Sequence, residues 1–570
     1  PGRPGQPHPD CHAVTQNPSV FTAGESDEDK IGRFIGGSSV SVVSSFIGGL
    51  FALGWAALMT RVLSKEDYAI VGPYMQVFWI LSTVVSMGVP HTLVTFISHN
   101  VETDFEAARD IARQGTRLLL LFALVFCQHA TVATIALAAA GARELYVWLC
   151  AIMVVCIFTR QMFFSNYATL AGLQRMDLLS LANIIFSISL PFVSLGYIML
   201  AGALAPGRSM YQVLAGTGSI GTASVISYAA SLAIVGRTRL PARVLLSFKG
   251  RLTRWREILT FGWVATVAIM GNTVVGLLPP IYMSYVMAQG LGWYGPDPAA
   301  NREAAGVFSC AFTYAMAPML VMGLTFALIP AMSEAEAQGN RPLLNRYFNT
   351  SVKYCFSICA MLTAIYAVVI GRFVHFFTGG EYAVETIHTL TLAMECGMAA
   401  TALFFLFLSM LIGLKRPAVA AKTVVLIICM EIAAMSLAGW LSGNLLITVG
   451  AVAASLLIGD VILLYYLISR AELSMQWGLF VPPVISAVAS WAVCSAVMPD
   501  NILGFFVACF LGIPLFFFVD GMLGGIDPSD LSTVRSTLQS LRLGALCRLV
   551  DIAERIFKLS PFYIKEAKSL

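Results

Sequence analysis

Four charged side chains lie inside long apolar stretches of the sequence, where ionised groups are rare. Arg160 precedes Gln161 in one stretch, and Glu395, Glu431 and Asp460 lie in three later ones. A guanidinium stays ionised and presents a planar fork to phosphate oxygens. A buried carboxylate can exchange a proton or ligate a cation. These residues therefore predict phosphate recognition by Arg160, with Gln161 as a further candidate for substrate binding, and proton or sodium coupling by the three acids.

A structural role competes with each of these predictions. Arg160 could instead form a structural salt bridge, with Glu395 as its partner. The acids could instead stabilise helix packing through hydrogen bonds. Arg61 is a further candidate for substrate binding at the outer mouth of the protein. An exposed arginine, or one paired with a neighbouring acid, is the alternative there.

The composition places these residues in a membrane. The 570-residue chain is 58% hydrophobic and 12% charged, about half the charge of an ordinary soluble domain. Its apolar runs reach the roughly 20 residues that cross a hydrocarbon layer, without the alternation of strands. The sequence therefore predicts an all-α polytopic membrane protein with about fourteen transmembrane helices. The expected spans are 34–60, 70–97, 117–140, 145–170, 178–203, 212–236, 259–285, 306–332, 350–371, 385–412, 418–440, 444–469, 479–497 and 501–519.

The basic residues predict the orientation of the chain. If the N-terminus is cytoplasmic, most of the 35 Lys and Arg fall on the cytoplasmic side of the membrane, as the positive-inside rule requires. We expect a multi-pass membrane protein with both termini in the cytoplasm.

Two similar stretches predict an internal duplication. LAGLQRMD at 170–177 and LIGLKRPA at 411–418 are 241 residues apart, and Pro90 and Pro330 are 240 apart. Six predicted spans separate each landmark from its copy, and an even number restores orientation. We therefore expect two pseudo-symmetric six-helix lobes around a central cleft, followed by two extra C-terminal helices. Two lobes that can part on either side are typical of a transporter.

This organisation divides the chain into six parts. They are a disordered cytoplasmic N-terminus (1–33), an N-lobe (34–236), a basic cytoplasmic connector (237–258), a C-lobe (259–470), the two extra helices (471–520) and a basic amphipathic cytoplasmic tail (521–570).

Several motifs resemble those of a known transporter family. MTRVLSKEDYAIVGPY (59–74) resembles a signature of polysaccharide flippases, although Ala69 stands where that signature has glycine. EAAGVFSCAFTYAMAP (303–318), ALIPAMSEA (327–335) and the two repeated turns are similar to the same family. The resemblance covers roughly 34–470. It is to the oligosaccharide flippase (Wzx-like) branch of the multidrug/oligosaccharidyl-lipid/polysaccharide (MOP) exporter superfamily.

The resemblance implies translocation of a polyprenyl-pyrophosphate-linked oligosaccharide by alternating access, for cell-surface polysaccharide biosynthesis. By analogy with related flippases, Asn272 would add an oxygen to a sodium site with Glu431. Three alternatives remain. They are a peptidoglycan lipid-precursor flippase, a cation-coupled drug or metabolite antiporter, and a non-translocating scaffold of a polysaccharide synthase complex. First-span residues 34–60 contain no acid, which disfavours the antiporter.

The remaining expectations concern hinges, partners and chemistry. Gly48 and Gly49 in the first span and Pro279 and Pro280 in the seventh are hinge candidates, with close helix packing as the alternative. The expected partners are the lipid-linked oligosaccharide, membrane lipids and polysaccharide polymerase or synthase proteins, and no nucleic acid. The sequence has no G-x-x-x-x-G-K-[ST] loop, catalytic triad or metal-ligand spacing. We therefore expect no enzymatic activity, no metal site and no cofactor beyond a coupling Na⁺ or H⁺.

Overall fold

The computed structural model describes most of the chain, and the regions that it describes are helical or irregular, with no strand among them. The described residues are 27–100, 104–173, 175–206, 209–238, 240, 242–245, 252–288, 298–378, 384–414, 416–497, 502–528, 530–532, 534–535 and 544–562.

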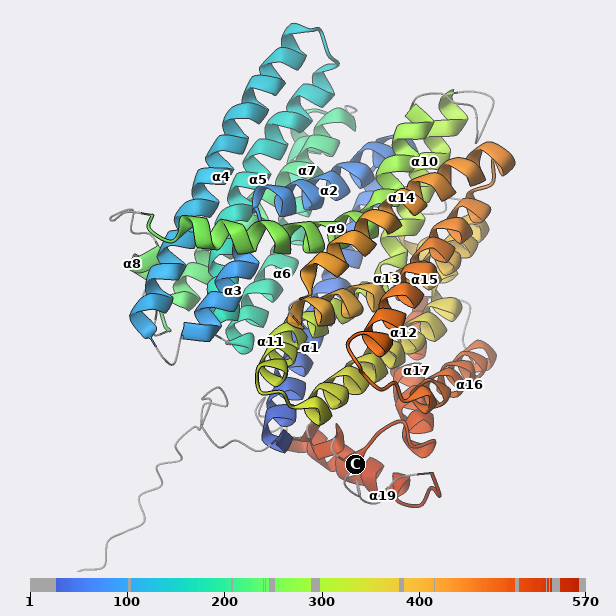
Figure 1. The fold of residues 1–570 in the computed structure, drawn as a ribbon. Coiled ribbons are helices and arrows are strands. Elements are labelled where there is room, and N and C mark those ends of the chain that lie inside the picture. The colour runs from blue at the N-terminus through green and yellow to red at the C-terminus, as the bar shows by residue number, and fades with distance from the viewer. Residues whose placement is uncertain are drawn as a thin grey trace, which may run out of the picture.

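Figure 1 shows the helices in chain order. They are α1 (Asp27–Val62), α2 (Lys65–Val85), α3 (Val89–Asn100), α4 (Phe105–Ala139), α5 (Glu144–Gly172), α6 (Met176–Leu204), α7 (Ser209–Val235), α8 (Ala242–Leu245), α9 (Trp255–Ala288), α10 (Pro298–Ala315), the 3₁₀-helix η1 (Ala317–Val321), α11 (Met322–Ala337), α12 (Arg341–Thr378), α13 (Val384–Gly413), α14 (Pro417–Ser442), α15 (Leu445–Ser469), the 3₁₀-helix η2 (Trp477–Phe480), α16 (Val481–Val497), α17 (Ile502–Met522) and α19 (Gly544–Phe557).

The helices are those of a polytopic membrane protein. Among the described residues, 12 helices are long and apolar enough to cross a membrane. Two shorter apolar segments, Val274–Met283 and Val507–Met522, lie in α9 and α17, where the sequence predicts the seventh and fourteenth spans. The predicted all-α membrane fold is confirmed.

Two predicted spans are interrupted rather than continuous, and this corrects the expectation from sequence. The span predicted at 70–97 is α2 followed by α3, with left-handed backbone at Met87 (φ 47°) and Gly88 (φ 66°). A Cβ on Gly88 would lie 2.2 Å from the Gly262 carbonyl oxygen, so only glycine fits this turn. The span predicted at 306–332 is α10, η1 and α11 in succession.

The repeated turns form the same structure twice. The Leu173 N–H donates to the Thr169 carbonyl (3.0 Å), and the Leu414 N–H donates to the Met410 carbonyl (2.8 Å). Two residues further on in each turn, the Arg175 N–H donates to the Leu170 carbonyl and the Arg416 N–H donates to the Leu411 carbonyl. Donors and acceptors both differ by 241 residues, the offset of the two sequence motifs.

A glycine in each repeated turn allows close packing within its own lobe. A Cβ on Gly172 would lie 2.7 Å from the Ile97 side chain of α3. A Cβ on Gly413 would lie 2.8 Å from the Met332 side chain and 3.0 Å from the Ile329 carbonyl, both in α11. Each turn therefore presses the fourth span of its lobe against the second half of an interrupted span.

The two halves of the chain also use the same helix pairs. In the first half, α1 packs on α6, α5 packs on α4 and α7, and α3 packs on α5. Six spans later, α9 packs on α14, α13 packs on α12 and α15, and α11 packs on α13. These pairs are equivalent under the duplication, and Figure 1 shows the resulting two groups of helices. The chain thus forms two pseudo-symmetric lobes, and α16 and α17 pack on α12 as two extra helices.

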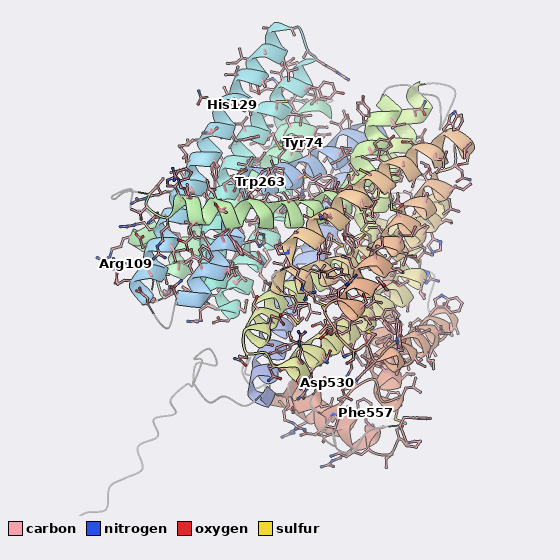
Figure 2. The ribbon with its side chains drawn as sticks, viewed as in Figure 1. Tyr74, Arg109, His129, Trp263, Asp530 and Phe557 are labelled. Carbon is pink, nitrogen blue, oxygen red and sulfur yellow. The ribbon has the colours of Figure 1, made fainter. Side chains whose placement is uncertain are left out.

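Helix α9 contacts both lobes. Near its start, the Thr92 hydroxyl of α3 donates to the Ile258 carbonyl (3.3 Å). Near its end, the Tyr282 hydroxyl is hydrogen-bonded to Ser436 of α14. Figure 1 shows α9 running across from one helix group to the other, and Figure 2 marks Trp263 on its first half. A change in the angle between the lobes must therefore involve this helix.

Some predicted boundaries fall inside helices. Helix α1 begins at Asp27, before the predicted lobe boundary at residue 34, and α9 begins at Trp255, before the predicted boundary at 259. Residues 1–26 of the predicted disordered terminus and much of the connector lie outside the described residues.

The close glycine contacts predict unequal effects of one substitution. Gly172→Ala and Gly413→Ala are each expected to lower the apparent Tm of the purified protein, because overpacking costs about 1–3 kcal/mol. Gly196→Ala and Gly202→Ala, at α6 positions where a Cβ meets nothing within 4 Å, should leave the Tm unchanged or raise it. Thermal unfolding in one detergent compares the four variants. Equal Tm values across them would contradict the packing role.

Candidate functional site

Arg160 lies at the centre of a group of aromatic rings. Its side chain comes from the middle of α5, and the residue is 7% exposed. Its Cζ lies 4.5 Å from the ring centroid of Phe186, 4.7 Å from Phe164, and 4.8 Å from both Trp79 and Phe163. The four rings, which we call the ring cage, come from α2, α5 and α6. Cation–π attraction from desolvated rings is worth up to about 2 kcal/mol each, so the cage makes a buried cation tolerable.

Among the residues that the structure describes, none is an anionic partner of the guanidinium. Arg160 Nε and Nη1 are buried without a hydrogen-bond partner, and so are both carboxylate oxygens of Glu395. The alternative of a structural bridge between these two residues is therefore wrong. The rings stabilise the charge, but no ring acts as a hydrogen-bond acceptor for Nε or Nη1. The site has the donors of an anion site and lacks the acceptor.

Gln161 follows Arg160 in α5, and its side chain bonds α2. Its Nε2 donates to the Ser82 carbonyl of α2 at 2.6 Å, whereas its Oε1 and the Ser82 hydroxyl have no partner. This places unpaired donors and acceptors next to one another where α2 meets α5. The sequence identified Arg160 and Gln161 but missed Ser82 and the ring cage, since these residues are ordinary in apolar helices and only the fold brings them together.

The three predicted coupling acids are buried on three different helices of the second lobe. Glu395 of α13 and Glu431 of α14 are 0% exposed, and Asp460 of α15 is 7% exposed. None of their six carboxylate oxygens has a hydrogen-bond partner, so hydrogen-bonded packing does not explain them. Ionised carboxylates of this kind are expensive in a low-dielectric interior unless a proton or cation neutralises them.

The acids do not form one cation site. Within the described residues no three His, Cys, Asp or Glu side chains lie close enough to hold a metal ion. Glu395 instead lies near Tyr366, and Asp460 near Cys355, both on α12. Coupling at these positions would therefore act through single carboxylates.

The remaining candidates lie elsewhere. Arg61 is exposed in the last turn of α1, away from the ring cage. Asn272 lies in α9, but its side chain falls outside the described residues.

The hinge candidates lie in uninterrupted helices. A Cβ on Gly48 would lie 2.9 Å from Ser187 Oγ, and one on Gly49 would lie 2.4 Å from a methyl group of Leu320. Pro279 and Pro280 are buried inside α9. These contacts fit the alternative of close packing, and the hinge role stays a prediction.

One contact between the two lobes is made where the start of α2 meets the end of α10. The Tyr68 hydroxyl donates to Thr313 Oγ1 at 3.1 Å, and Thr60 Oγ1 and the Tyr314 hydroxyl are hydrogen-bonded at 3.1 Å. A Cβ on Gly72 would lie 2.9 Å from the Ser309 side chain. The second halves of the same two spans, α3 and α11, do not pack on each other in the described part of the chain. The lobes are also joined through other helix pairs, because α1 packs on α11 and α12, and α2 and α3 pack on α9.

Comparisons with known proteins agree with this architecture. The model of the polysaccharide biosynthesis protein family matches residues 34–336. No curated protein sequence matches the chain.

Several solved structures share the fold. One is the inward-facing conformation of a multidrug resistance MATE family transporter of the MOP superfamily, with TM-score 0.59, 15% identity, and 76% of this chain and 98% of the other covered. A MATE complex with MaL6 has TM-score 0.61, 14% identity and coverage of 79% and 97%. The lipid II flippase MurJ in an inward closed conformation has TM-score 0.59, 12% identity and coverage of 85% and 98%. At these identities the likeness shows a common fold.

The ring cage predicts that Arg160 is dispensable for folding. Arg160→Met should leave the apparent Tm of the purified protein within a few degrees of wild type. Methionine fills the cage, and the substitution removes the unpaired donor nitrogens Nε and Nη1. Thermal unfolding and size-exclusion chromatography in detergent measure this. A large fall in Tm, or aggregation, would assign the arginine a structural role.

Proposed function

The chain belongs to the polysaccharide biosynthesis family, and we propose from this premise that it is a flippase for a lipid-linked oligosaccharide. It would move a polyprenyl-pyrophosphate glycan across the bacterial cytoplasmic membrane, with both of its own termini in the cytoplasm. The fold is that of transporters and flippases rather than of a known enzyme class, and the proposed step is translocation without bond cleavage. The supported class is a multi-pass membrane transporter, and the glycolipid substrate is our proposal.

The observation that carries this proposal is the unpaired guanidinium of Arg160. It is buried and stabilised by four rings, and two of its donor nitrogens, Nε and Nη1, have no acceptor. A substrate phosphate would supply the missing acceptor and the opposite charge together. Gln161 Oε1 and Ser82 Oγ, which also lack partners, are suited to hydroxyl groups on the sugar next to the phosphate.

The contact between the lobes fits alternating access. The orientation predicted from the basic residues would put the start of α2, with Tyr68, toward the outer face, where it meets the last turn of α10. Alternating access would require this contact, and the contacts of α1 with α11 and of α3 with α9, to open in turn on the two sides of the membrane.

The solved structures with this fold include transporters for two other classes of substrate. The charge of Arg160 bears on which class this protein would accept. The MATE structures are of multidrug resistance transporters, but a buried unpaired cation repels a cationic drug. The lipid II flippase moves a lipid-linked precursor, whose chemistry is close to that proposed here. Membership of the polysaccharide biosynthesis family favours a surface glycan over the peptidoglycan precursor.

The first functional prediction concerns charge at position 160. In liposomes that contain a fluorescent polyprenyl-pyrophosphate oligosaccharide, wild type should exchange it between leaflets. Arg160→Lys should retain part of the rate, and Arg160→Gln should lose at least tenfold, since a charged hydrogen bond is worth about 1.5–3 kcal/mol.

Arg175→Gln is the matched control, because Arg175 is paired with Asp177 at 2.8 Å in a turn. It should exchange the glycolipid near the wild-type rate. Equal rates in Arg160→Lys and Arg160→Gln would remove the phosphate contact. Efflux of a cationic dye with a static glycolipid would assign the protein to drug transport.

The second functional prediction concerns coupling by the acids. If Glu431 is neutralised by a transported proton or sodium ion, Glu431→Gln should uncouple flipping from an imposed ion gradient while leaving gradient-free exchange measurable. Glu395→Gln and Asp460→Asn test the other two positions in the same assay. Rates that respond equally to the gradient in all three variants and in wild type would end the coupling role.

A further inference from the structure

Helix α19 is fixed at the end of the last membrane helix. Phe557 packs against Gly521 of α17, where a Cβ would lie 2.4 Å from its ring. The Ser560 hydroxyl donates to the carbonyl of Met522, the last residue of α17. Because Val507–Met522 is a short apolar segment in the fourteenth predicted span, these contacts would place α19 at the boundary between hydrocarbon and water. Figure 2 shows Phe557 at this end of the second lobe, near Asp530.

A buried ion cluster fixes the base of the same segment. Lys353 of α12 pairs with Asp527 (2.9 Å) and Asp530 (2.8 Å), and the Tyr354 hydroxyl donates to Asp530. The chain that leaves α17 is therefore tied to a second membrane helix, so α19 is not a freely moving tail.

One face of α19 is exposed and mixes arginines with apolar side chains. Arg548, Ile552 and Arg555 are exposed and follow one another at helical spacing, and Leu559 lies in the next turn. Ile552 is 53% exposed and Leu559 is 81% exposed. Val550, Ala553 and Phe557 lie on the opposite face, against Met522 and Ile526. We call the exposed residues Arg548, Ile552, Arg555 and Leu559 the α19 stripe.

The charges of the stripe are unpaired, whereas the other charges of the helix are paired. Arg535 bonds Asp551 (2.6 Å) and Glu554 (2.8 Å), and Lys558 bonds Glu554 (2.8 Å). The bonds from Lys558 and Arg535 lower the pKa of Glu554, which keeps this carboxylate ionised and paired. Arg548 and Arg555 make no ion pair or hydrogen bond to the described residues. The two acids of α19 are thus paired with Arg535 and Lys558 from outside the helix, which leaves the positive charges of Arg548 and Arg555 on the stripe.

We propose that the α19 stripe binds anionic phospholipid of the adjacent leaflet. Ile552 and Leu559 would enter the headgroup layer, and Arg548 and Arg555 would contact lipid phosphates. The depth fixed by Phe557 and Ser560 favours lipid over a soluble protein, because the helix already lies at the membrane surface. The inference depends on neither the glycan substrate nor the direction of transport.

The test measures amide hydrogen exchange of residues 547–562 in the full-length protein in nanodiscs. Phosphatidylcholine discs are compared with discs that also contain phosphatidylglycerol. The proposal predicts slower exchange with phosphatidylglycerol, and Arg555→Gln should reduce this protection about fivefold, the weight of one basic residue at an anionic surface. Arg548→Gln should act alike, and exchange in α12 serves as the check on folding.

Lys558→Gln is the matched control. It also removes one positive charge, three residues after Arg555, but the Lys558 side chain is paired with Glu554. It should retain most of the lipid-dependent protection. Equal exchange in the two kinds of disc, or equal losses in Arg555→Gln and Lys558→Gln, would overturn the proposal. Protection that depends on two copies per disc and not on phosphatidylglycerol would assign the stripe to a contact between copies, which also overturns it.

Discussion

A cation buried in a membrane protein without a counter-ion is the constraint from which this account proceeds. Removing a guanidinium from water costs several kcal/mol, and rings repay only part of that cost. Two donor nitrogens of Arg160, Nε and Nη1, nevertheless have no acceptor. Such an arrangement is poor as a stabilising device and well suited to a site whose anion arrives with the substrate.

The duplicated scaffold and the charged residues are separate features of the chain. Thr401 occupies the second-lobe position equivalent to Arg160 at the offset of the repeated turns, and it donates to the Gly397 carbonyl (2.9 Å) as an ordinary helix residue. The acids lie only in the second lobe. The duplicated packing thus gives two similar bodies, and the unshared charges give one lobe a buried guanidinium and the other lobe three buried carboxylates. This division of roles suits a transporter that couples an anionic substrate to a cation.

The sequence predicted much of the fold and less of the site. Hydropathy located the membrane helices, and the repeated turns revealed the duplication, because both depend on local composition and close glycine packing. The interruption at Gly88 was missed, since it depends on contact with Gly262, 174 residues away. Intramembrane charge singled out Arg160, but the ring cage draws on three helices. The absence of a partner for Glu395 could not be foreseen either, because pairing is a property of the assembled lobes.

Equilibrium binding tests the phosphate contact most directly. Purified wild-type protein and Arg160→Met would each be titrated with a polyprenyl pyrophosphate and with the corresponding polyprenyl alcohol. The account predicts that wild type prefers the pyrophosphate by at least tenfold and that Arg160→Met binds the two lipids alike, with its affinity for the alcohol unchanged. A pyrophosphate preference that survives in Arg160→Met would contradict the central claim and place the anion site elsewhere in the protein.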